Sequence, residues 1–196
     1  MKRKSREMQV KPSIFIVCEG ESEERYFKHY RPGSRKISIA IERFDSDLDG
    51  AIEKFERKMK YDGIKINEND RIYFVFDMDE KKEREEATKN ILLKDRYNLS
   101  ISIPTFELWI LLHYTKWNVD NSTKEDIERK LKGYIKKYYH GLDVYPKISE
   151  YTEQAINRAR KLLEGKNLTE EELYLSQANP ITHVYKLVEI LESERN

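Results

Sequence analysis

The chain contains a single cysteine, Cys18, among its 196 residues. One cysteine excludes a disulfide framework and a cysteine-based zinc site, and it fits a reducing compartment. Because Cys18 ends the apolar stretch that begins at Ile14, we expect its thiol to pack in the core rather than to react.

Long hydrophobic runs are also absent. No apolar run approaches the roughly 20 residues that span a bilayer. The apolar stretch that ends at Cys18 is too short for the hydrophobic region of a signal peptide, and acidic residues follow it. The sequence therefore predicts a soluble cytoplasmic protein with no membrane partner.

The chain has almost no net charge, since 37 Lys and Arg residues stand against 36 Asp and Glu residues and give +1 at pH 7. This balance excludes a global electrostatic field that would draw the protein onto nucleic acid. Contacts with nucleic acid must then come from local basic patches, or a partner must supply much of the phosphate-binding surface.

Strand and helix patterns alternate over the first part of the chain. Apolar or alternating segments predict strands at 13–18, 37–44, 72–76 and 99–103, and helical patterns follow them at 22–31, 48–59, 81–94 and 106–114. This alternation is typical of βαβ units on a parallel sheet. We therefore predict an α/β core over residues 10–116, with a mostly parallel four-stranded sheet flanked by helices. Only helical patterns follow, which predicts a C-terminal helical extension over 117–196, packed on the core.

Two acidic residues follow the third predicted strand. Asp77 and Asp79 are spaced i, i+2, so an extended backbone directs both carboxylates to the same side of the sheet. A carboxylate pair at the carboxyl end of a strand in an open α/β sheet is well placed to hold Mg²⁺ or Mn²⁺. The structural alternative is that Asp79 caps the following helix and Asp77 lies in the turn.

Further acidic residues lie at the ends of other strands. Glu19 ends the first strand, and Glu107 lies two residues into the helix after the fourth. Gly20 permits a tight turn after Glu19, and Ser22 is a candidate N-cap for the helix that follows. In a doubly wound sheet these acids all lie on one rim, where they repel each other unless cations neutralise them. The structural alternatives are that Glu19 is only a turn residue and that Glu107 is only an acid at a helix N-terminus.

The motifs at these positions resemble a known domain. The segment from Cys18 to Glu23 after a buried strand, with Asp77 to Asp79 after a later one, is similar to the Toprim domain of topoisomerases, primases and OLD-type nucleases. The segments from Ile103 to His113 and from Asn179 to Val184 extend the resemblance. From about residue 10 to 192 the chain resembles the RloB-like family, which is associated with bacterial and archaeal defence loci and is often encoded beside an ABC-type ATPase.

The resemblance implies a fold, an activity and a set of site residues. The fold is Toprim-like (Rossmann-like), and the activity is a Mg²⁺- or Mn²⁺-dependent nuclease of antiphage defence that acts on DNA or RNA, with an ABC-type ATPase as partner. It implies Glu19 as a general acid or base or as a metal ligand. It further implies that Asp77 and Asp79 are cation ligands and that Glu107 is a further acidic ligand. Glu23 would contact Glu19 or a metal-bound water, and His113 would occupy a core or supporting position.

Other functions compete with a nuclease. A receiver domain needs paired acids after its first strand and a lysine after a fifth, whereas here only Glu19 follows the first strand and no fifth strand is evident. Phosphatases of the Asp-x-Asp type carry that motif on the first strand rather than the third. A third alternative is a non-catalytic or regulatory subunit that binds an ATPase or a toxin. The sequence also leaves a homo-oligomer open.

A basic and aromatic segment follows the α/β pattern. Ser122 or Thr123 can cap a helix whose apolar stripe runs from Ile127 through Tyr138. Lysines lie off that stripe and are interleaved with tyrosines and a histidine. Two interpretations stay open: a nucleic-acid surface, or a solvated face above core tyrosines. The candidate nucleic-acid contacts are Lys130, Lys136 and Lys137.

Overall fold

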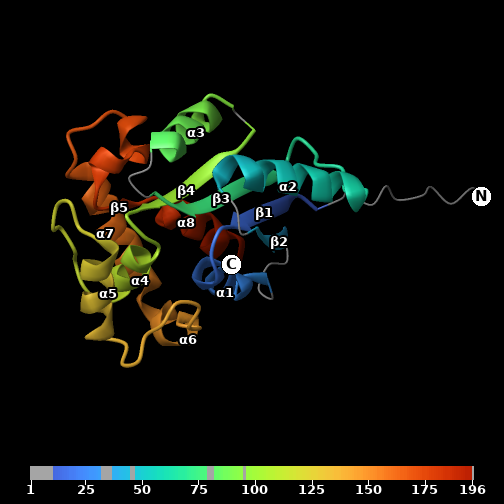
Figure 1. The fold of residues 1–196 in the computed structure, drawn as a ribbon. Helices are drawn as coiled ribbons and strands as arrows, with labels where there is room; N and C mark the ends of the chain where they lie inside the picture. The colour runs from blue at the N-terminus through green and yellow to red at the C-terminus, as the bar shows by residue number, and fades with distance from the viewer. Residues whose placement is uncertain (1–10, 32–36, 45–46, 79–81, 95, 196) are drawn as a thin grey trace, which may run out of the picture.

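A computed structural model describes residues 11–31, 37–44, 47–78, 82–94 and 96–195. Helices and strands alternate in it up to α4, and helical elements dominate thereafter (Figure 1). The elements of the first part are β1 (Ser13–Cys18), α1 (Glu21–Lys28), β2 (Ser38–Arg43), α2 (Leu48–Tyr61), β3 (Arg71–Asp77), α3 (Lys82–Leu92), β4 (Asn98–Ile103) and α4 (Glu107–Tyr114). Those of the second part are α5 (Lys124–Lys132), α6 (Tyr145–Ile148), η2 (Ser149–Tyr151), α7 (Thr152–Glu164), η3 (Glu172–Tyr174), η4 (Ser176–Ala178), β5 (Ile181–Thr182) and α8 (Val184–Arg195).

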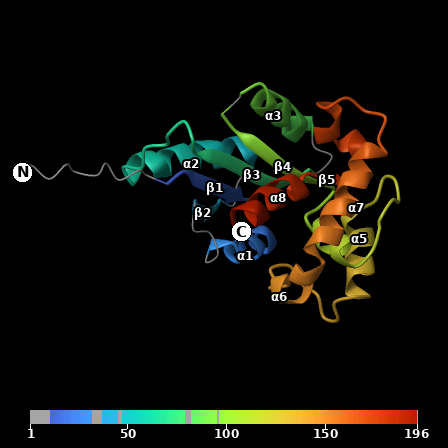
Figure 2. The ribbon, with the colours of Figure 1, turned by 180° about the vertical axis from the view of Figure 1, so that it is seen from behind.

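The sheet has five strands in the order β2-β1-β3-β4-β5, and all neighbouring pairs except β4 and β5 are parallel. Figure 1 shows α2 and α3 on one face of the sheet, and Figure 2, from behind, shows α8 and α1 on the other. Helices α4 to α7 gather at the end of the sheet where the parallel strands finish. The predicted α/β class with a mostly parallel, helix-flanked sheet is confirmed.

The central strands form because they are apolar on both faces. In β1 and β3 every residue from the second to the sixth is buried, which is expected for parallel strands covered by helices on both sides. Cys18 is fully buried, and burial raises the pKa of its thiol well above the usual value, so the expected packing role is confirmed. The packing of these two strands therefore fixes the position of their carboxyl ends at one edge of the sheet.

A fifth strand extends the sheet beyond the predicted four. Ile181 and Thr182 pair antiparallel with Ile103 and Ser102, so β4 lies between β3 and β5. Two residues after a proline carry no alternation that a sequence pattern can reveal, and the pairing depends on a contact across the chain. His183 rather than a lysine follows this strand, so it does not complete the arrangement of a receiver domain.

Two local predictions in helices are wrong. Gly20, not Ser22, is the N-cap of α1, and no side chain caps that helix. The helix predicted to continue to Tyr138 ends at Lys132, and of the two predicted caps Thr123 is the N-cap, in a capping box with Asp126. Gly133 follows, and Lys137 has a positive φ of 62°, which no continuous helix permits. Ile135 and Tyr138, which belong to the predicted apolar stripe, are buried although they lie outside the helix.

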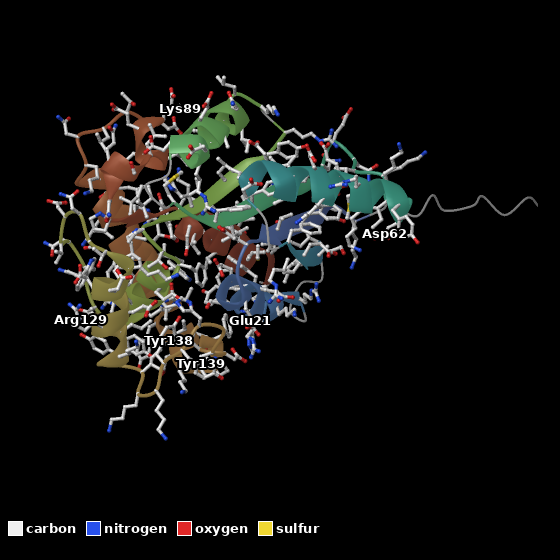
Figure 3. All side chains as sticks on the ribbon, in the orientation of Figure 1. Glu21, Asp62, Lys89, Arg129, Tyr138 and Tyr139 are labelled. Atoms are coloured by element: carbon white, nitrogen blue, oxygen red, sulfur yellow. The ribbon has the colours of Figure 1, made fainter. Side chains whose placement is uncertain are left out.

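The loop at 133–142 reaches from α5 to the first helix of the core. The Gly141 N–H donates to Ser22 Oγ at 3.0 Å, and Figure 3 shows Tyr138 and Tyr139 close to Glu21. Ser22 therefore anchors this loop rather than capping its own helix. Within the described part of the chain, no helix has both the length and the apolar character needed to cross a membrane.

Candidate active site

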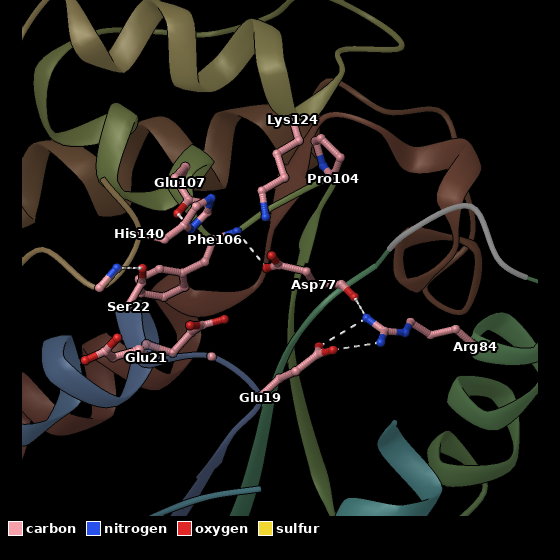
Figure 4. A pocket seen from close by; sticks show the side chains of 13 residues that line it. Glu19, Glu21, Ser22, Asp77, Arg84, Pro104, Phe106, Glu107, Lys124 and His140 are labelled. Atoms are coloured by element: carbon pink, nitrogen blue, oxygen red, sulfur yellow. Dashed lines mark hydrogen bonds and ion pairs between the residues drawn. The ribbon is translucent and has the colours of Figure 1, made fainter. Parts of the chain in front are cut away.

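A cleft of about 510 Å³ lies at the carboxyl ends of β1 and β3 (Figure 4). Its walls come from the β1–α1 turn, the end of β3, α3, the β4–α4 junction, the start of α5 and the loop at 133–142. The lining residues are Glu19, Gly20, Glu21, Ser22, Glu23, Asp77, Arg84, Pro104, Phe106, Glu107, Lys124, His140 and Gly141. The cleft thus brings together Glu19, Asp77 and Glu107, as the strand-end argument predicts.

The β1–α1 turn fixes Glu19 and folds Glu23 over the backbone. The Glu19 N–H donates to the Val75 carbonyl at 3.2 Å, which extends the β1–β3 pairing to this residue. A Cβ at position 20 would overlap Glu23 Oε2, so any larger residue there would have to displace the Glu23 carboxylate. Burial raises the pKa of the Glu23 carboxyl well above its usual value, and the negative charge of Asp77 adds to this rise.

Asp77 accepts two hydrogen bonds from the β4–α4 junction. The Phe106 N–H donates to Asp77 Oδ1 at 2.7 Å, and the Thr105 hydroxyl lies 3.1 Å from Oδ2. Asp77 therefore lies at the N-terminal end of α4, where backbone N–H groups favour a negative charge. Burial and the neighbouring charge of Glu107 nevertheless raise the pKa of Asp77 to about 7. Asp77 consequently keeps its proton to a higher pH than an exposed carboxyl would.

Glu107 is 1% exposed and is surrounded by hydrogen-bond partners. The Tyr138 hydroxyl donates to Oε1 at 2.7 Å, and His140 Nδ1 lies 3.0 Å from the same oxygen. The Thr105 hydroxyl also contacts Glu107 Oε2. One hydroxyl has one proton, so Thr105 cannot donate to both Asp77 and Glu107. A proton on one of the carboxyls, or a cation beside them, resolves this conflict.

Arg84 brings a positive charge from α3 into the cleft. Its Nη2 lies 2.8 Å from Glu19 Oε1 and its Nη1 3.1 Å from Glu19 Oε2, a two-point contact of the kind that guanidinium groups make with carboxylates. Nη1 also donates to the Asp77 carbonyl oxygen. The sequence indicated only a helix at this point, so nothing in it marked Arg84 as a cleft residue.

Four other cleft contacts were not assigned to the site from the sequence: Thr105, Lys124, Tyr138 and His140. Lys124 lines the cleft at the start of α5, and its charge lowers the pKa of Asp77 against the larger opposing effects. His140 joins two acids, since its Nε2 lies 2.8 Å from Glu128 Oε1. The interleaved tyrosines and histidine at 134–140 were the only sequence signal for Tyr138 and His140. The sequence did not show that these residues contact Glu107.

The remaining predicted residues lie elsewhere. Asp79 falls outside the described residues. His113 is 2% exposed, its Nδ1 faces the Trp109 carbonyl at 2.9 Å, and burial lowers its pKa to about 4, so it occupies the core. Lys130, Lys136 and Lys137 do not line the cleft. Within the described ranges, no three His, Cys, Asp or Glu side chains are grouped closely enough to enclose a metal ion.

Comparison with known proteins places the chain in a family. No curated protein and no solved structure matches it. A family profile described as RloB-like protein matches residues 14–191, a span that contains β1 except Ser13, β2 to β5, the whole cleft and most of α8. The chain therefore belongs to the RloB-like protein family.

Proposed function

We propose that the protein is a metal-dependent phosphodiesterase that cleaves nucleic acid. One observation carries this proposal: Glu19, Asp77 and Glu107, from three separate segments, line a single cleft at the carboxyl ends of the parallel strands. Ligand sites in open α/β sheets lie at this edge. Burial, and after it the charges of neighbouring acids, raise the pKa values of Asp77 and Glu23, and a divalent cation would offset that repulsion.

The donor atoms fit Mg²⁺ or Mn²⁺, because carboxylate oxygens are the ligands that hard cations prefer. Mg²⁺ is usually held by one or two carboxylates together with water and substrate phosphates, so a full cage of protein ligands is not needed. Asp77 and Glu107 would hold the ion, with Asp79 as a predicted additional ligand. When bound, the cation would neutralise the phosphodiester and lower the pKa of a bound water.

The positive residues of the cleft support binding of a phosphodiester. Arg84 and Lys124 line the same cleft as the acids. A guanidinium suits a phosphate oxygen pair as well as it suits a carboxylate. On arrival of the substrate, Arg84 would exchange Glu19 for the phosphate, and the released Glu19 would accept or donate the proton of the reaction. We include antiphage defence and a nearby ABC-type ATPase partner in the proposal because of the RloB-like family.

Cleavage assays with matched variants test the proposal. Purified protein is incubated with DNA, total RNA and tRNA in Mg²⁺ or Mn²⁺, with and without the product of the neighbouring gene, and with EDTA as the metal-free control. We expect Asp77→Asn and Glu107→Gln to abolish metal-stimulated cleavage. Glu53→Gln, whose side chain is 76% exposed on α2, should cleave like the natural protein. Unchanged cleavage by Asp77→Asn would refute the proposal.

One observation favours a non-catalytic subunit as the second candidate. Glu19 is already neutralised by Arg84, so the carboxylate of the Toprim-like turn needs no cation in this structure. A regulatory subunit that binds an ATPase or a toxin would retain such a pair. Calorimetric titration with Mg²⁺ and Mn²⁺ separates the two functions, because no binding at millimolar concentration would support the non-catalytic subunit.

A further inference from the structure

Three tyrosine rings cluster at the surface of the helical part, with the half-buried Tyr114 between the exposed Tyr134 and Tyr151. The rings of Tyr114 and Tyr134 are stacked, with centroids 5.1 Å apart and planes 12° apart, and the Tyr151 ring lies 6.3 Å from that of Tyr114. Tyr134 is 43% exposed and Tyr151 38% exposed. We call these three residues the tyrosine platform. Tyr114 also packs against the hydrophobic core, whereas the exposed rings of Tyr134 and Tyr151 offer aromatic surface to a ligand.

Positive charge borders one side of the platform. Lys130 Nζ lies 6.0 Å from the centroid of the Tyr134 ring. Lys130, Lys136 and Lys137 form no ion pair with any residue that the structure describes. The segment 124–140 contains six lysines and arginines and three acids.

The three acids of this segment are Glu125, Asp126 and Glu128. Asp126 accepts hydrogen bonds from Thr123 and Arg129, and Glu128 contacts Lys132 and His140. The unpaired lysines therefore keep their charge available for a polyanion. On the far side, the Glu150 carboxylate contacts the Tyr151 hydroxyl, so a polyanion would run along the Lys130 side.

The platform and the cleft are connected by two elements. Helix α4 has Glu107 at its first residue and Tyr114 at its last, seven positions apart, which corresponds to about 10 Å of helix axis. The loop at 133–142 carries Tyr134 near its start and Tyr138 and His140 at the cleft. Because stacked nucleotides of one strand rise by roughly 3.4 Å each, about three nucleotides cover the same distance.

We propose that the tyrosine platform binds the bases of a single-stranded nucleic acid, about three nucleotides from the phosphodiester that enters the cleft. The position relative to the cut rests on the proposed nuclease function, whereas the binding itself does not. A base stacks on an exposed aromatic ring only when it is free of its duplex partner, while lysines beside the ring contact the backbone phosphates. The expected substrate is therefore single-stranded, or carries a single-stranded end or loop.

Binding in EDTA tests the platform without any cleavage. Fluorescence anisotropy is measured with a short labelled single strand of RNA, the same sequence as DNA, and the matching duplexes. We expect Tyr134→Ala to weaken single-strand binding about tenfold, as expected for the loss of one stacked base, and to leave duplex binding unchanged. Tyr134→Trp should bind like the natural protein. Tyr61→Ala removes a tyrosine that is 91% exposed on α2 and serves as the matched control.

The contribution of Lys130 and the position of the platform relative to the cut are tested separately. Lys130→Ala should reduce the salt dependence of single-strand binding, because one phosphate contact is lost. Ultraviolet crosslinking of a strand with one photoreactive base should join Tyr134 to a base about three nucleotides from the cut. Binding and crosslinking without any cleavage by the natural protein would contradict the proposed nuclease and leave the platform standing.

Other outcomes would overturn the platform itself. Equal single-strand affinity of the natural protein, Tyr134→Ala and Tyr61→Ala is one of them, and a failure of the natural protein to bind any single strand is another. If Tyr134→Ala changes only the oligomeric state in light scattering, the surface is a contact between protein chains and the proposal is wrong.

Discussion

Arg84 and Glu19 form a two-point ion pair across the cleft, with Nη2 2.8 Å from Oε1 and Nη1 3.1 Å from Oε2. The two residues are 65 positions apart in the chain and come from α3 and the β1–α1 turn. Their side chains are only 14% and 28% exposed. The guanidinium of Arg84 therefore already balances the charge of the Glu19 carboxylate in the cleft.

Replacement of Arg84 should reveal whether its side chain competes with a metal ion for Glu19. We expect Arg84→Gln to lower the free energy of unfolding by about 1–3 kcal/mol in EDTA, because Glu19 loses its partner. Added Mg²⁺ or Mn²⁺ should then stabilise Arg84→Gln more than it stabilises the natural protein. Lys89→Gln, at an exposed position of the same helix, is the control. Urea unfolding at several cation concentrations measures both effects, and an identical cation response in all three proteins would contradict the competition.

Asp77 should make stability depend on pH in an unusual direction. Its pKa is about 7 in the folded protein against a usual 3.8, so the folded state holds a proton that the unfolded state has lost between these values. Stability contributed by this group is therefore present at low pH and is lost as pH rises from about 4 to 7.

The neutral variant Asp77→Asn should remove that dependence. At pH 8 in EDTA we expect it to exceed the natural protein in unfolding free energy by roughly 1–3 kcal/mol, and the difference should shrink toward pH 4. Thermal and urea unfolding across this range measure the effect. A difference that stays constant with pH would show that Asp77 does not titrate there.

The Tyr138 hydroxyl should stabilise the buried Glu107 carboxyl. Tyr138→Phe deletes one donor to Glu107 Oε1 while keeping the ring, and we expect a loss of about 1–3 kcal/mol in unfolding free energy. Tyr139→Phe changes the adjacent tyrosine, which is 59% exposed, and should cost almost nothing. Equal effects of the two changes in urea unfolding would rule out a specific role for the Tyr138 hydrogen bond.

Substitution of Gly20 should lower stability only because the Glu23 side chain lies against it. Its φ of −109° is accessible to any residue, so a Gly20→Ala penalty must come from the overlap with the Glu23 carboxylate. We expect Gly20→Ala to destabilise by about 1–3 kcal/mol. In a double-mutant cycle, the same change in a Glu23→Ala background should cost much less. Additive effects would show that another contact sets the requirement for glycine.

The sequence predicts the α/β core and the convergence of three acids because both follow from strand patterns. Carboxyl ends of parallel strands share one edge, which predicts a common rim for Glu19 and Asp77, and the pairing of β1 with β3 in the structure makes their strands neighbours. Glu107 follows from the same argument through β4. A role in catalysis or metal binding for these residues stays a prediction.

The features that the sequence did not reveal depend on contacts between distant segments. Arg84 belongs to a helix whose charged residues predict a solvated face, and only the fold directs this one inward. The pairing of β5 with β4 joins Thr182 to Ser102, 80 positions away. Apolar periodicity also cannot signal the end of α5 at Lys132 or the positive φ at Lys137.

The late position of β5 and of the loop at 133–142 has a consequence for biosynthesis. A ribosome releases the α/β segments first, with Glu19, Asp77 and Glu107 in place but with neither His140 beside Glu107 nor β5 along β4. The wall of the cleft that His140 and Gly141 form is added only after these segments have emerged. A translation product that ends before residue 133 therefore carries Glu19, Asp77 and Glu107 without this wall of the cleft.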